Sequence, residues 1–405
     1  MNTITIEEIA ARDPNEILVA DIRKQEDFLR GSMEGAVNIP AERAEEAETL
    51  LDRRKEICVL CYTGERSQEF VEILEEKGYS VWNIEGGYRS YLRNHLEQIV
   101  RDEEHIKERT AEIERSIIKK FRKSVWRPFT RGIREYELIQ PGDKIAVCIS
   151  GGKDSMLMAK LLQELQRHGK VPFELVFLCM NPGYREDNWE IIRNNAQVLG
   201  IPLTVFESEI FDVVAGIDKN PCYLCARMRR GYLYAKAKEL GCNKIALGHH
   251  FDDVIETTLM GMLYGGKIET MMPKLHSLNF SGMELIRPMY LIHEEAIKAW
   301  RDYNHLGFIQ CACRFTENCV SCGGGRGSKR DEMKELIASF REISDVIEMN
   351  IFRSVHNINL RTVIGYHKDD WTYSFLDDYE KYANTDQESE TDADRNAASK
   401  ERGEV

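Results

Sequence analysis

Apolar positions between residues 141 and 360 fall into two alternating patterns. Short continuous apolar runs at 145–149, 172–179, 202–207 and 244–247 are typical of strands buried on both faces of a sheet. Elsewhere, apolar residues recur every three or four positions, as in Leu157, Leu161 and Leu165 and again over 189–199, which predicts amphipathic helices. Strands that alternate with helices predict an α/β domain built on a doubly wound parallel sheet.

A shorter version of the same alternation occupies residues 1–98. Apolar runs at 18–23, 57–60 and 81–84 predict three strands, and a helical pattern over 68–77 lies between the second and the third. Glycines and a proline within 31–40 mark turns. We therefore expect a separate, small α/β domain with a parallel sheet.

Two further segments complete the expected organisation. Over 100–126, apolar and charged residues mix at helical spacing without glycine or proline, which predicts a helical linker within 99–140 that ends near Pro128. The C-terminal extension, 361–405, is polar and acidic from about Tyr379 onward. We expect this extension to be mostly disordered.

The net charge of −13 argues against a nucleic-acid binder until its distribution is considered. Residues 1–98 carry −9 and residues 376–405 carry −6, which leaves +2 for 99–375. If the cations of this middle region are clustered, they could contact nucleic-acid phosphates. The alternative is that the clustered cations form an ordinary solvated face of a helix. The cluster just before the run at 145–149 consists of Lys119, Lys120, Arg122, Lys123, Arg127, Arg131 and Arg134.

Neither membrane insertion nor secretion is expected. The chain contains no apolar run of the roughly eighteen residues that a membrane helix needs, and its first residues lack the basic and apolar regions of a signal peptide. We therefore predict a cytoplasmic protein, in which thiols stay reduced. Eleven cysteines in such a protein favour metal, persulfide or redox chemistry over a disulfide framework.

A glycine-rich loop suited to an anion follows the run at 145–149. Two glycines let backbone amides approach a phosphate, and the N-terminus of the following helix adds the positive end of its dipole. The G-x-x-x-x-G-K-[ST] pattern of kinases and GTPases is absent. The run at 244–247 delivers Gly248, His249 and Asp252 to the same edge of the sheet. The loop consists of Ser150, Gly151, Gly152, Lys153, Asp154 and Ser155.

A candidate nucleophile follows the strand at 57–60. Cys61 begins the loop that leads into the helix at 68–77, and Arg66 lies in the same loop. Loop amides, the helix dipole and Arg66 all favour a thiolate over a thiol, and a sulfur-carrying cysteine needs that form. The alternative is a buried cysteine at a strand end, without activity.

The C-x-x-C pair of Cys222 and Cys225 has several interpretations. It fits half of a zinc site, a redox pair, or two ligands of an iron–sulfur cluster, although the strand context of a thioredoxin pair is absent. Spacing alone does not choose between zinc and a cluster, and purely structural cysteines are a further possibility. Additional ligands are available from Cys311, Cys313, Cys319 and Cys322.

The first hundred residues resemble a rhodanese domain. The resemblance rests on D-x-R at Asp21 and on C-x-x-G-x-R-S from Cys61 to Ser67. In that family the loop cysteine carries a persulfide, and the resemblance implies this role for Cys61, with Arg66 as the loop arginine. One departure is Ser32-Met33, where the family usually has His-Ile or a similar pair.

Residues 135–355 resemble a branch of the PP-loop ATP pyrophosphatases, the tRNA 2-thiocytidine synthetases. The resemblance rests on S-G-G-K-D-S, C-x-L-C-x-R-x-R-R-G, G-H-H-x-D-D and a late C-x-x-C-G. It implies tRNA as partner, ATP with Mg²⁺, adenylation of a cytidine C2 oxygen, and replacement of that oxygen by sulfur. It also implies a 4Fe-4S cluster held by three cysteines and, for Arg227, Arg229 and Arg230, contact with tRNA phosphates, with ordinary surface arginines as the alternative.

The third cluster ligand is where this chain departs from the family. Cys222 and Cys225 match the first two ligands, and Cys322 is the expected third. An extra C-x-C precedes the late C-x-x-C-G, so Cys313 and Cys311 are rivals, and a separate zinc site stays open.

Taken together, these features predict an ATP-dependent tRNA sulfurtransferase. The loop 150–155 and Gly248 are expected to hold ATP, with Lys153 against the phosphates and Asp154 near Mg²⁺. His249 and Asp252 are expected beside the adenylation site, and Cys61 would relay sulfur from a cysteine desulfurase. A homodimer is possible. The alternatives are a PP-loop enzyme that thiolates another base or a small molecule, and a non-catalytic sulfur or metal carrier.

Overall fold

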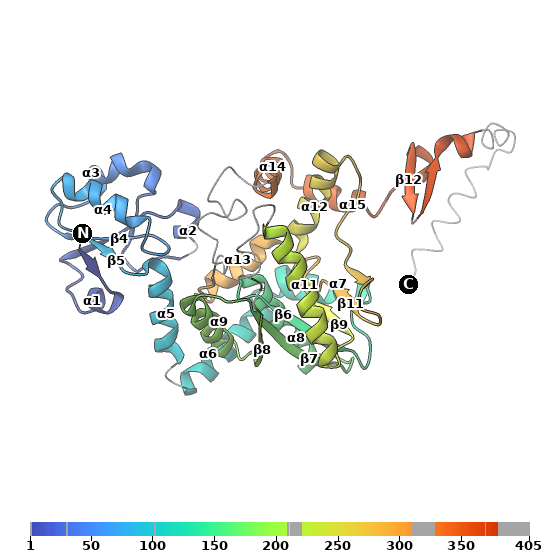
Figure 1. Ribbon diagram of the computed structural model, residues 1–405, viewed down its shortest axis with the longest axis horizontal. Coiled ribbons are helices and arrows are strands. Elements are labelled where there is room, and N and C mark those ends of the chain that lie inside the picture. Colours follow the sequence, from blue (N-terminus) through green and yellow to red (C-terminus); the bar gives the residue numbers. More distant parts are fainter. Residues whose placement is uncertain are drawn as a thin grey trace. The chain divides into compact units, whose positions relative to one another are not determined.

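The computed structural model describes residues 2–29, 31–100, 103–208, 210, 221–309, 329–368 and 370–379. Contacts between Cα atoms divide the chain into two compact units, residues 1–344 and 345–405. The first unit contains two sheets and the second a two-stranded hairpin (Figure 1). None of the described helices is long and apolar enough to cross a membrane.

The N-terminal sheet is parallel and has the strand order β1-β5-β4-β2-β3. Its central strands are the three apolar runs of the sequence, so the predicted small parallel α/β architecture is confirmed. Cys58 is fully buried in β4, as its place in an apolar run suggests. The strands are β1 (Thr3–Ile4), β2 (Ile17–Asp21), β3 (Val37–Asn38), β4 (Glu56–Leu60) and β5 (Val81–Ile84). The helices are α1 (Ile6–Ala10), α2 (Gln25–Leu29), η1 (Ala41–Glu46), α3 (Ala47–Leu50) and α4 (Ser67–Glu76).

The second sheet has the order β10-β11-β9-β6-β7-β8 and is parallel except for the antiparallel edge strand β10. The chain starts in the middle, at β6, and adds strands first on one side and later on the other. Loops after β6 and β9 therefore meet at a topological switch point, where sheets of this kind bind ligands. The strands are β6 (Lys144–Ile149), β7 (Glu174–Asn181), β8 (Leu203–Glu207), β9 (Lys244–Ala246), β10 (Lys274–His276) and β11 (Glu284–Ile286).

Helices pack around this sheet and enclose an apolar core that includes Leu157, Leu161 and Leu162 of α8. Cys148, Cys179 and Cys242 are buried in or beside the strands and belong to the core. The helices are α8 (Lys153–His168), α9 (Glu186–Val198), α11 (Pro221–Glu239), α12 (Phe251–Gly265), α13 (Glu294–Tyr303) and α14 (Lys329–Ile343).

The connector differs from the single helix that the sequence suggests. It comprises α5 (Gly87–Val100), α6 (Glu103–Ile118), a π-helical turn η2 (Arg122–Trp126) and α7 (Arg127–Glu135). Pro128 does not end the connector, because it occupies the first turn of α7, where a missing N–H costs nothing. Lys160 of α8 is fully buried and pairs with Glu114 of α6 at 2.5 Å, which fixes the connector to the second sheet.

The second unit contains helix α15 (Ile347–Ser354) and an antiparallel hairpin of β12 (Gly365–Lys368) and β13 (Trp371–Ser374). Two short 3₁₀ helices flank the hairpin, η4 (Leu360–Thr362) and η5 (Phe375–Asp377). Part of the extension expected to be mostly disordered is therefore ordered, and stacked rings of Tyr366 and Tyr373 stabilise it. Residues 380–405 lie outside the described part of the chain.

Candidate functional site

The loop between β6 and α8 has the geometry of an anion cradle. Gly152 is the N-cap residue of α8, so the first amides of the helix point out of the loop. Ser155 holds the loop in shape, since its hydroxyl donates to the Gly152 carbonyl at 3.0 Å and accepts from the Ser150 amide at 3.2 Å. The two hydroxyls of Ser150 and Ser155 lie 3.1 Å apart.

The two glycines of this loop serve different purposes. Gly151 has φ +84°, and a Cβ there would lie 2.5 Å from Ile192 and 2.9 Å from Ile309. Gly152 has an ordinary φ of −83°, and a Cβ there would meet nothing closer than the Ser150 hydroxyl at 3.8 Å. Gly151 is thus required by the fold, whereas Gly152 leaves open space beside the helix N-terminus.

The loop after β9 packs directly on the start of α8. A Cβ at Gly248 would lie 3.2 Å from the Ser155 amide nitrogen and 3.3 Å from the Asp154 carbonyl carbon. A side chain at 248 would be tighter than most Cβ contacts, and glycine thus lets the G-H-H-x-D-D loop lie closely against the anion cradle. The sequence prediction that both loops share one edge of the sheet is confirmed.

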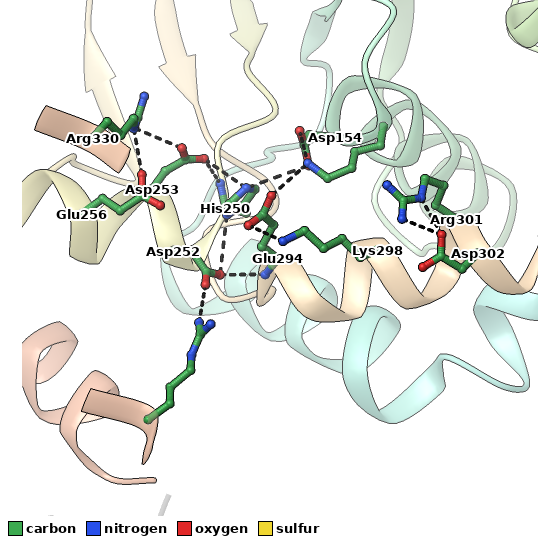
Figure 2. A network of polar contacts seen from close by, with 12 residues as sticks. Asp154, His250, Asp252, Asp253, Glu256, Glu294, Lys298, Arg301, Asp302 and Arg330 are labelled. Atoms are coloured by element: carbon green, nitrogen blue, oxygen red, sulfur yellow. Dashed lines mark hydrogen bonds and ion pairs between the residues drawn. The ribbon is translucent and has the colours of Figure 1, made fainter. Parts of the chain in front are cut away.

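Lys153 pairs with two carboxylates, those of Asp154 and Glu294, which are labelled in Figure 2. Its Nζ lies 3.1 Å from Asp154 and 3.1 Å from Glu294 of α13. Burial alone would lower the pKa of Lys153, but the two carboxylates outweigh it and raise that pKa. Burial likewise opposes the charge of Glu294, and Lys153 with Lys298 nevertheless holds the pKa of Glu294 well below its usual range.

The G-H-H-x-D-D loop begins α12 with a dense group of ionisable side chains (Figure 2). His250 is buried, and its Nε2 lies 3.5 Å from Asp253 and 3.9 Å from Asp154. Burial lowers the pKa of His249 to about 4, so this imidazole is neutral at pH 7. Within the described part of the chain, three buried atoms here have no hydrogen-bond partner, namely Asp154 Oδ1, His249 Nδ1 and His250 Nδ1. Such atoms suit a polar ligand.

Asp252 is 4% exposed, and both of its carboxylate oxygens accept hydrogen bonds. Its Oδ2 accepts the Glu294 amide at 2.6 Å and its Oδ1 accepts Arg341 at 2.7 Å. Arg330 bridges Asp253 and Glu256 in the same way, at 3.1 and 2.7 Å. These pairs tie α12, α13 and α14 together around the cradle. The geometry thus gives Asp252 a supporting position beside the loop.

The loop after β4 surrounds the sulfur of Cys61. The Gly64 amide donates to Sγ at 3.0 Å, and the Ser67 hydroxyl lies 3.2 Å from Sγ. Ser67 donates to Asn83 Oδ1 at 2.5 Å, and Asn83 in turn donates to the Gly64 carbonyl at 2.9 Å. Cys61 is 3% exposed, so these hydrogen bonds act on a sulfur that water hardly reaches.

Arg66 is the N-cap residue of α4, and its side chain is exposed. The predicted thiolate environment therefore rests on Gly64, Ser67 and the helix start. The D-x-R motif is internal to the domain, because Asp21 and Arg23 form a buried ion pair at 2.6 Å. Ser32, at the position where the chain departs from the family pattern, also donates to Asp21 at 2.5 Å.

The cysteine pair lies on the first turns of α11. Cys222 and Cys225 are three residues apart in the sequence of this helix. Cys225 is half-buried beside the apolar cluster that includes Met180. Two cysteines at this spacing fit the sulfur donor set of an iron–sulfur cluster as well as that of zinc. Cys311, Cys313, Cys319 and Cys322 lie outside the described residues.

The predicted basic positions divide into two groups. All seven cations of the connector cluster are exposed. On α11, Arg229 donates to the hydroxyl of the buried Tyr184 at 3.1 Å, so this arginine has an internal partner. Arg227 is exposed, and Arg230 is exposed as well.

Four residues of these sites were missed from the sequence: Ser67, Asn83, His250 and Glu294. His250 and Ser67 lie inside motifs that were recognised in the sequence. A motif does not show which of its residues are buried, and the burial of these two was therefore missed. Asn83 is a polar residue within an apolar strand, which is a usable signal. Glu294 has no local signal, because it reaches Lys153 from a helix more than a hundred residues away.

Fold and loops together define a PP-loop enzyme with an attached rhodanese-like domain. The family model of the PP-loop domain matches residues 118–313, and that of the rhodanese-like domain matches residues 6–94. The tRNA-cytidine(32) 2-sulfurtransferase of Alkalilimnicola ehrlichii is 35% identical over 232 residues, covering 56% of this chain and 70% of the relative. That of Alcanivorax borkumensis is 36% identical over 250 residues, covering 60% and 84%. The chain belongs to this tRNA sulfurtransferase family.

Solved structures with partial similarity include the U34-tRNA thiolase NcsA from Methanococcus maripaludis with its [4Fe-4S] cluster. It is 22% identical with a TM-score of 0.45, covering 59% of this chain and 81% of the thiolase. A rhodanese-related protein from Thermoplasma volcanium is 28% identical with a TM-score of 0.22, covering 23% of this chain and 93% of its own.

Proposed function

We propose that this enzyme uses ATP to adenylate the C2 oxygen of a cytidine in tRNA and then replaces that oxygen by sulfur delivered by Cys61. One observation carries the proposal: Gly248 brings the loop after β9 into contact with the anion cradle at the start of α8. This gives one edge of the sheet a phosphate-binding helix N-terminus and neutral or acidic groups beside it. Membership of the tRNA-cytidine(32) 2-sulfurtransferase family supports tRNA as the substrate.

ATP phosphates are proposed to occupy the space beside Gly152, where the first amides of α8 point. Lys153 would then give up its ion pair with Glu294 and pair with a phosphate oxygen instead. Mg²⁺ usually takes one or two carboxylates together with phosphates, and Asp154 fits that role because its Oδ1 accepts no hydrogen bond from the described residues.

Adenylation is a displacement at the α-phosphorus. The C2 oxygen of cytidine attacks, a P–O bond forms, and pyrophosphate leaves with the electron pair of the broken bond. Neutral His249, whose Nδ1 has no hydrogen-bond partner among the described residues, is proposed to accept a hydrogen bond from the base or the nucleotide. In the second step a sulfide-level nucleophile attacks C2, and AMP departs with the former carbonyl oxygen.

Cys61 is proposed to carry the sulfur as a persulfide obtained from a cysteine desulfurase. Its Sγ accepts from the Gly64 amide, an environment that favours a thiolate. The outer sulfur of a persulfide is two electrons more oxidised than the sulfur of a thiocarbonyl, so a thiol reductant must supply two electrons per turnover. Cys222 and Cys225, with a third cysteine, are proposed to hold a 4Fe-4S cluster. When bound, such a cluster supplies an open iron as a Lewis-acidic position for sulfur.

The test uses purified, anaerobically reconstituted protein with unmodified tRNA, Mg·ATP and sodium sulfide. We expect 2-thiocytidine in the digested tRNA by nucleoside mass spectrometry, with one AMP and one pyrophosphate per sulfur. The Lys153→Ala variant should lose this activity, whereas Cys61→Ala should keep it with sulfide and lose it when a desulfurase and cysteine are the only source. Formation of a different thiolated nucleoside, or ATP cleavage without thiolation, would overturn the proposal.

A further inference from the structure

Helix α5 begins on the loop that holds Cys61. The Tyr88 amide donates to the Cys61 carbonyl at 2.8 Å, and the Arg89 amide donates to the Tyr62 carbonyl at 3.2 Å. Gly87 has φ +58°, and a Cβ there would lie 2.7 Å from the Gly64 nitrogen. The first turn of α5 is therefore fitted to the Cys61 loop, and any shift of this helix moves the loop.

The same helix is also built into the PP-loop domain. Leu92 and Leu96 belong to the core formed by α8 and the second sheet. Leu92 packs so closely on Gly307 that a side chain at 307 would overlap it. Ile309 follows two residues later and packs beside Gly151 of the anion cradle, where an added Cβ would lie 2.9 Å from the Ile309 side chain. The Cys61 loop and the cradle are thus joined through packed groups.

Arg89 forms the polar part of this junction. It is 7% exposed, and its Nη2 lies 2.9 Å from Asp187 in the first turn of α9. Arg93, one helical turn later, lies 3.5 Å from the same carboxylate and 3.8 Å from Glu190. A single exposed ion pair contributes little to stability. The guanidinium of Arg89, however, is buried, and the backbone amide of the same residue binds the Cys61 loop. Loss of the carboxylate partner would therefore leave a buried charge unpaired and disturb the position of the loop.

Asp187 directly follows a segment that reaches the cysteine helix. Tyr184, three residues earlier, accepts a hydrogen bond from Arg229 of α11 at 3.1 Å, and Cys225 lies on that helix. Arg185 lies 3.9 Å from Glu65 of the Cys61 loop. Residues 184–187 therefore border both the sulfur-carrying loop and the helix with the C-x-x-C pair.

We propose that Arg89 is a positioning residue that docks the Cys61 loop on α9, so that sulfur passes from Cys61 to the PP-loop domain of the same chain. This inference rests on the proposed function. The transfer is a thiol–persulfide exchange: an acceptor thiolate attacks the outer sulfur, a new S–S bond forms, and Cys61 leaves as a thiolate with the electron pair of the old bond. The exchange is redox-neutral, and the later reduction uses the thiol reductant named above.

A mixing experiment tests whether transfer stays within one chain. Full-length Cys61→Ala lacks the carrier and full-length Lys153→Ala lacks the ATP site, so together they thiolate tRNA only if sulfur crosses between chains. With a desulfurase, cysteine, Mg·ATP and dithiothreitol, we expect the mixture to stay at the level of either variant alone. Recovery of a substantial part of the wild-type rate in the mixture would overturn the inference.

Charge reversal tests the role of Arg89. Arg89→Asp and Asp187→Arg are each compared with the double variant that restores the pair in the opposite sense. The measured quantity is the ratio of the persulfide-dependent rate, after loading and removal of the desulfurase, to the sulfide-dependent rate. We expect each single variant to lower this ratio about tenfold and the double variant to recover most of it, as for directly coupled residues.

Two controls separate docking from folding. Arg193→Asp removes an exposed ion pair with Glu186 within α9 and should leave the ratio unchanged. Rhodanese activity towards thiosulfate and cyanide should be kept by Arg89→Asp, which shows an intact Cys61 loop. An unchanged ratio in Arg89→Asp contradicts the inference, whereas absence of persulfide-dependent thiolation in the wild type contradicts the proposed function instead.

Discussion

Glu294 Oε1 lies 3.1 Å from Lys153 Nζ, so a carboxylate from α13 occupies the place beside the cradle lysine that a phosphate would take. Asp252 fixes the start of that helix by accepting the Glu294 amide at 2.6 Å. Glu294 thus neutralises Lys153 and competes with an anionic ligand for it.

Replacing Glu294 by glutamine should tighten ATP binding and weaken the fold. Removing the competing charge changes the electrostatic balance at Lys153 by about 1 kcal/mol, which corresponds to roughly fivefold tighter binding of a non-hydrolysable ATP analogue by calorimetry. The pKa of Glu294 is lowered in the folded state, so its contribution to stability is present above its unfolded pKa and is lost as the pH falls.

Glu295→Gln is the matched control for Glu294, because Glu295 is 74% exposed and lies 3.7 Å from Arg341. That variant should bind the analogue as the wild type does. Equal affinities for Glu294→Gln and wild type would show that Lys153 is not the cation that meets the phosphates.

The two cradle glycines should respond differently to the same methyl group. Gly151→Ala places a Cβ against Ile192 and Ile309 and strains a left-handed backbone, so we expect a loss of about 2–4 kcal/mol in the free energy of unfolding. Gly152→Ala has an allowed φ and open space, so thermal unfolding should stay near that of the wild type.

Gly152→Ala should nevertheless lose ATP affinity by about tenfold or more, since its methyl group fills the space in front of the α8 amides. Thermal unfolding with and without the ATP analogue distinguishes the two effects. A Gly152→Ala protein that the analogue stabilises as strongly as the wild type would place the phosphates elsewhere.

His249 should make the stability depend on pH in acid solution. Its pKa is lowered by burial to about 4, whereas an unfolded histidine titrates near 6.5. The unfolded chain therefore binds more protons between these values, and stability that is fully present above about pH 6.5 is lost as the pH falls towards 4. Chemical unfolding at several pH values in this range, compared between wild type and His249→Gln, measures the effect.

His249→Gln should flatten that dependence, while His168→Gln should not, because His168 is 69% exposed. The same reasoning predicts no change of protonation at His249 between pH 6 and 8. A rate profile for thiolation that loses an inflection in this range upon His249→Gln would contradict the lowered pKa.

The architecture was readable from the sequence because its strands are buried on both faces and therefore appear as continuous apolar runs. The run at 145–149 and the loop after it also placed the cradle correctly, since the end of a central parallel strand is the usual ligand position. The hairpin of β12 and β13 was not predicted, because each of its strands has only four residues and neither forms an apolar run; stacking of Tyr366 on Tyr373 across the pair stabilises it.

The polar network around the cradle could not be derived in the same way. Lys153 and Glu294 come together only after the sheet has closed, and nothing near either residue in the sequence indicates the other. The burial of Asp252 under Arg341 is likewise a consequence of how α14 packs on α12. Motifs identify such residues as important, whereas tertiary packing decides which of them face a ligand.

Removal of the Ser67 hydroxyl should slow the loading of Cys61. A hydroxyl has one proton, and Ser67 donates it to Asn83 at 2.5 Å, so with a thiol it accepts from Cys61. With a thiolate, Ser67 turns this proton to Sγ, and the Gly64 amide provides the second hydrogen bond. In Ser67→Ala one of these two donors is lost. We expect about tenfold slower persulfide formation, which equals the loss of one charge-assisted hydrogen bond of about 1.4 kcal/mol.

Thiosulfate provides the measurement for this last variant. The Cys61 thiolate attacks the outer sulfur, sulfite leaves, and the mass of the Cys61 peptide increases by one sulfur atom. Ser80→Ala is the control, because Ser80 is exposed and its backbone carbonyl, not its side chain, binds Ile57. Cys58 should stay unmodified in all variants, since burial raises the pKa of its thiol to about 11. A Ser67→Ala protein that loads at the wild-type rate would leave the Gly64 amide as the group that activates the sulfur.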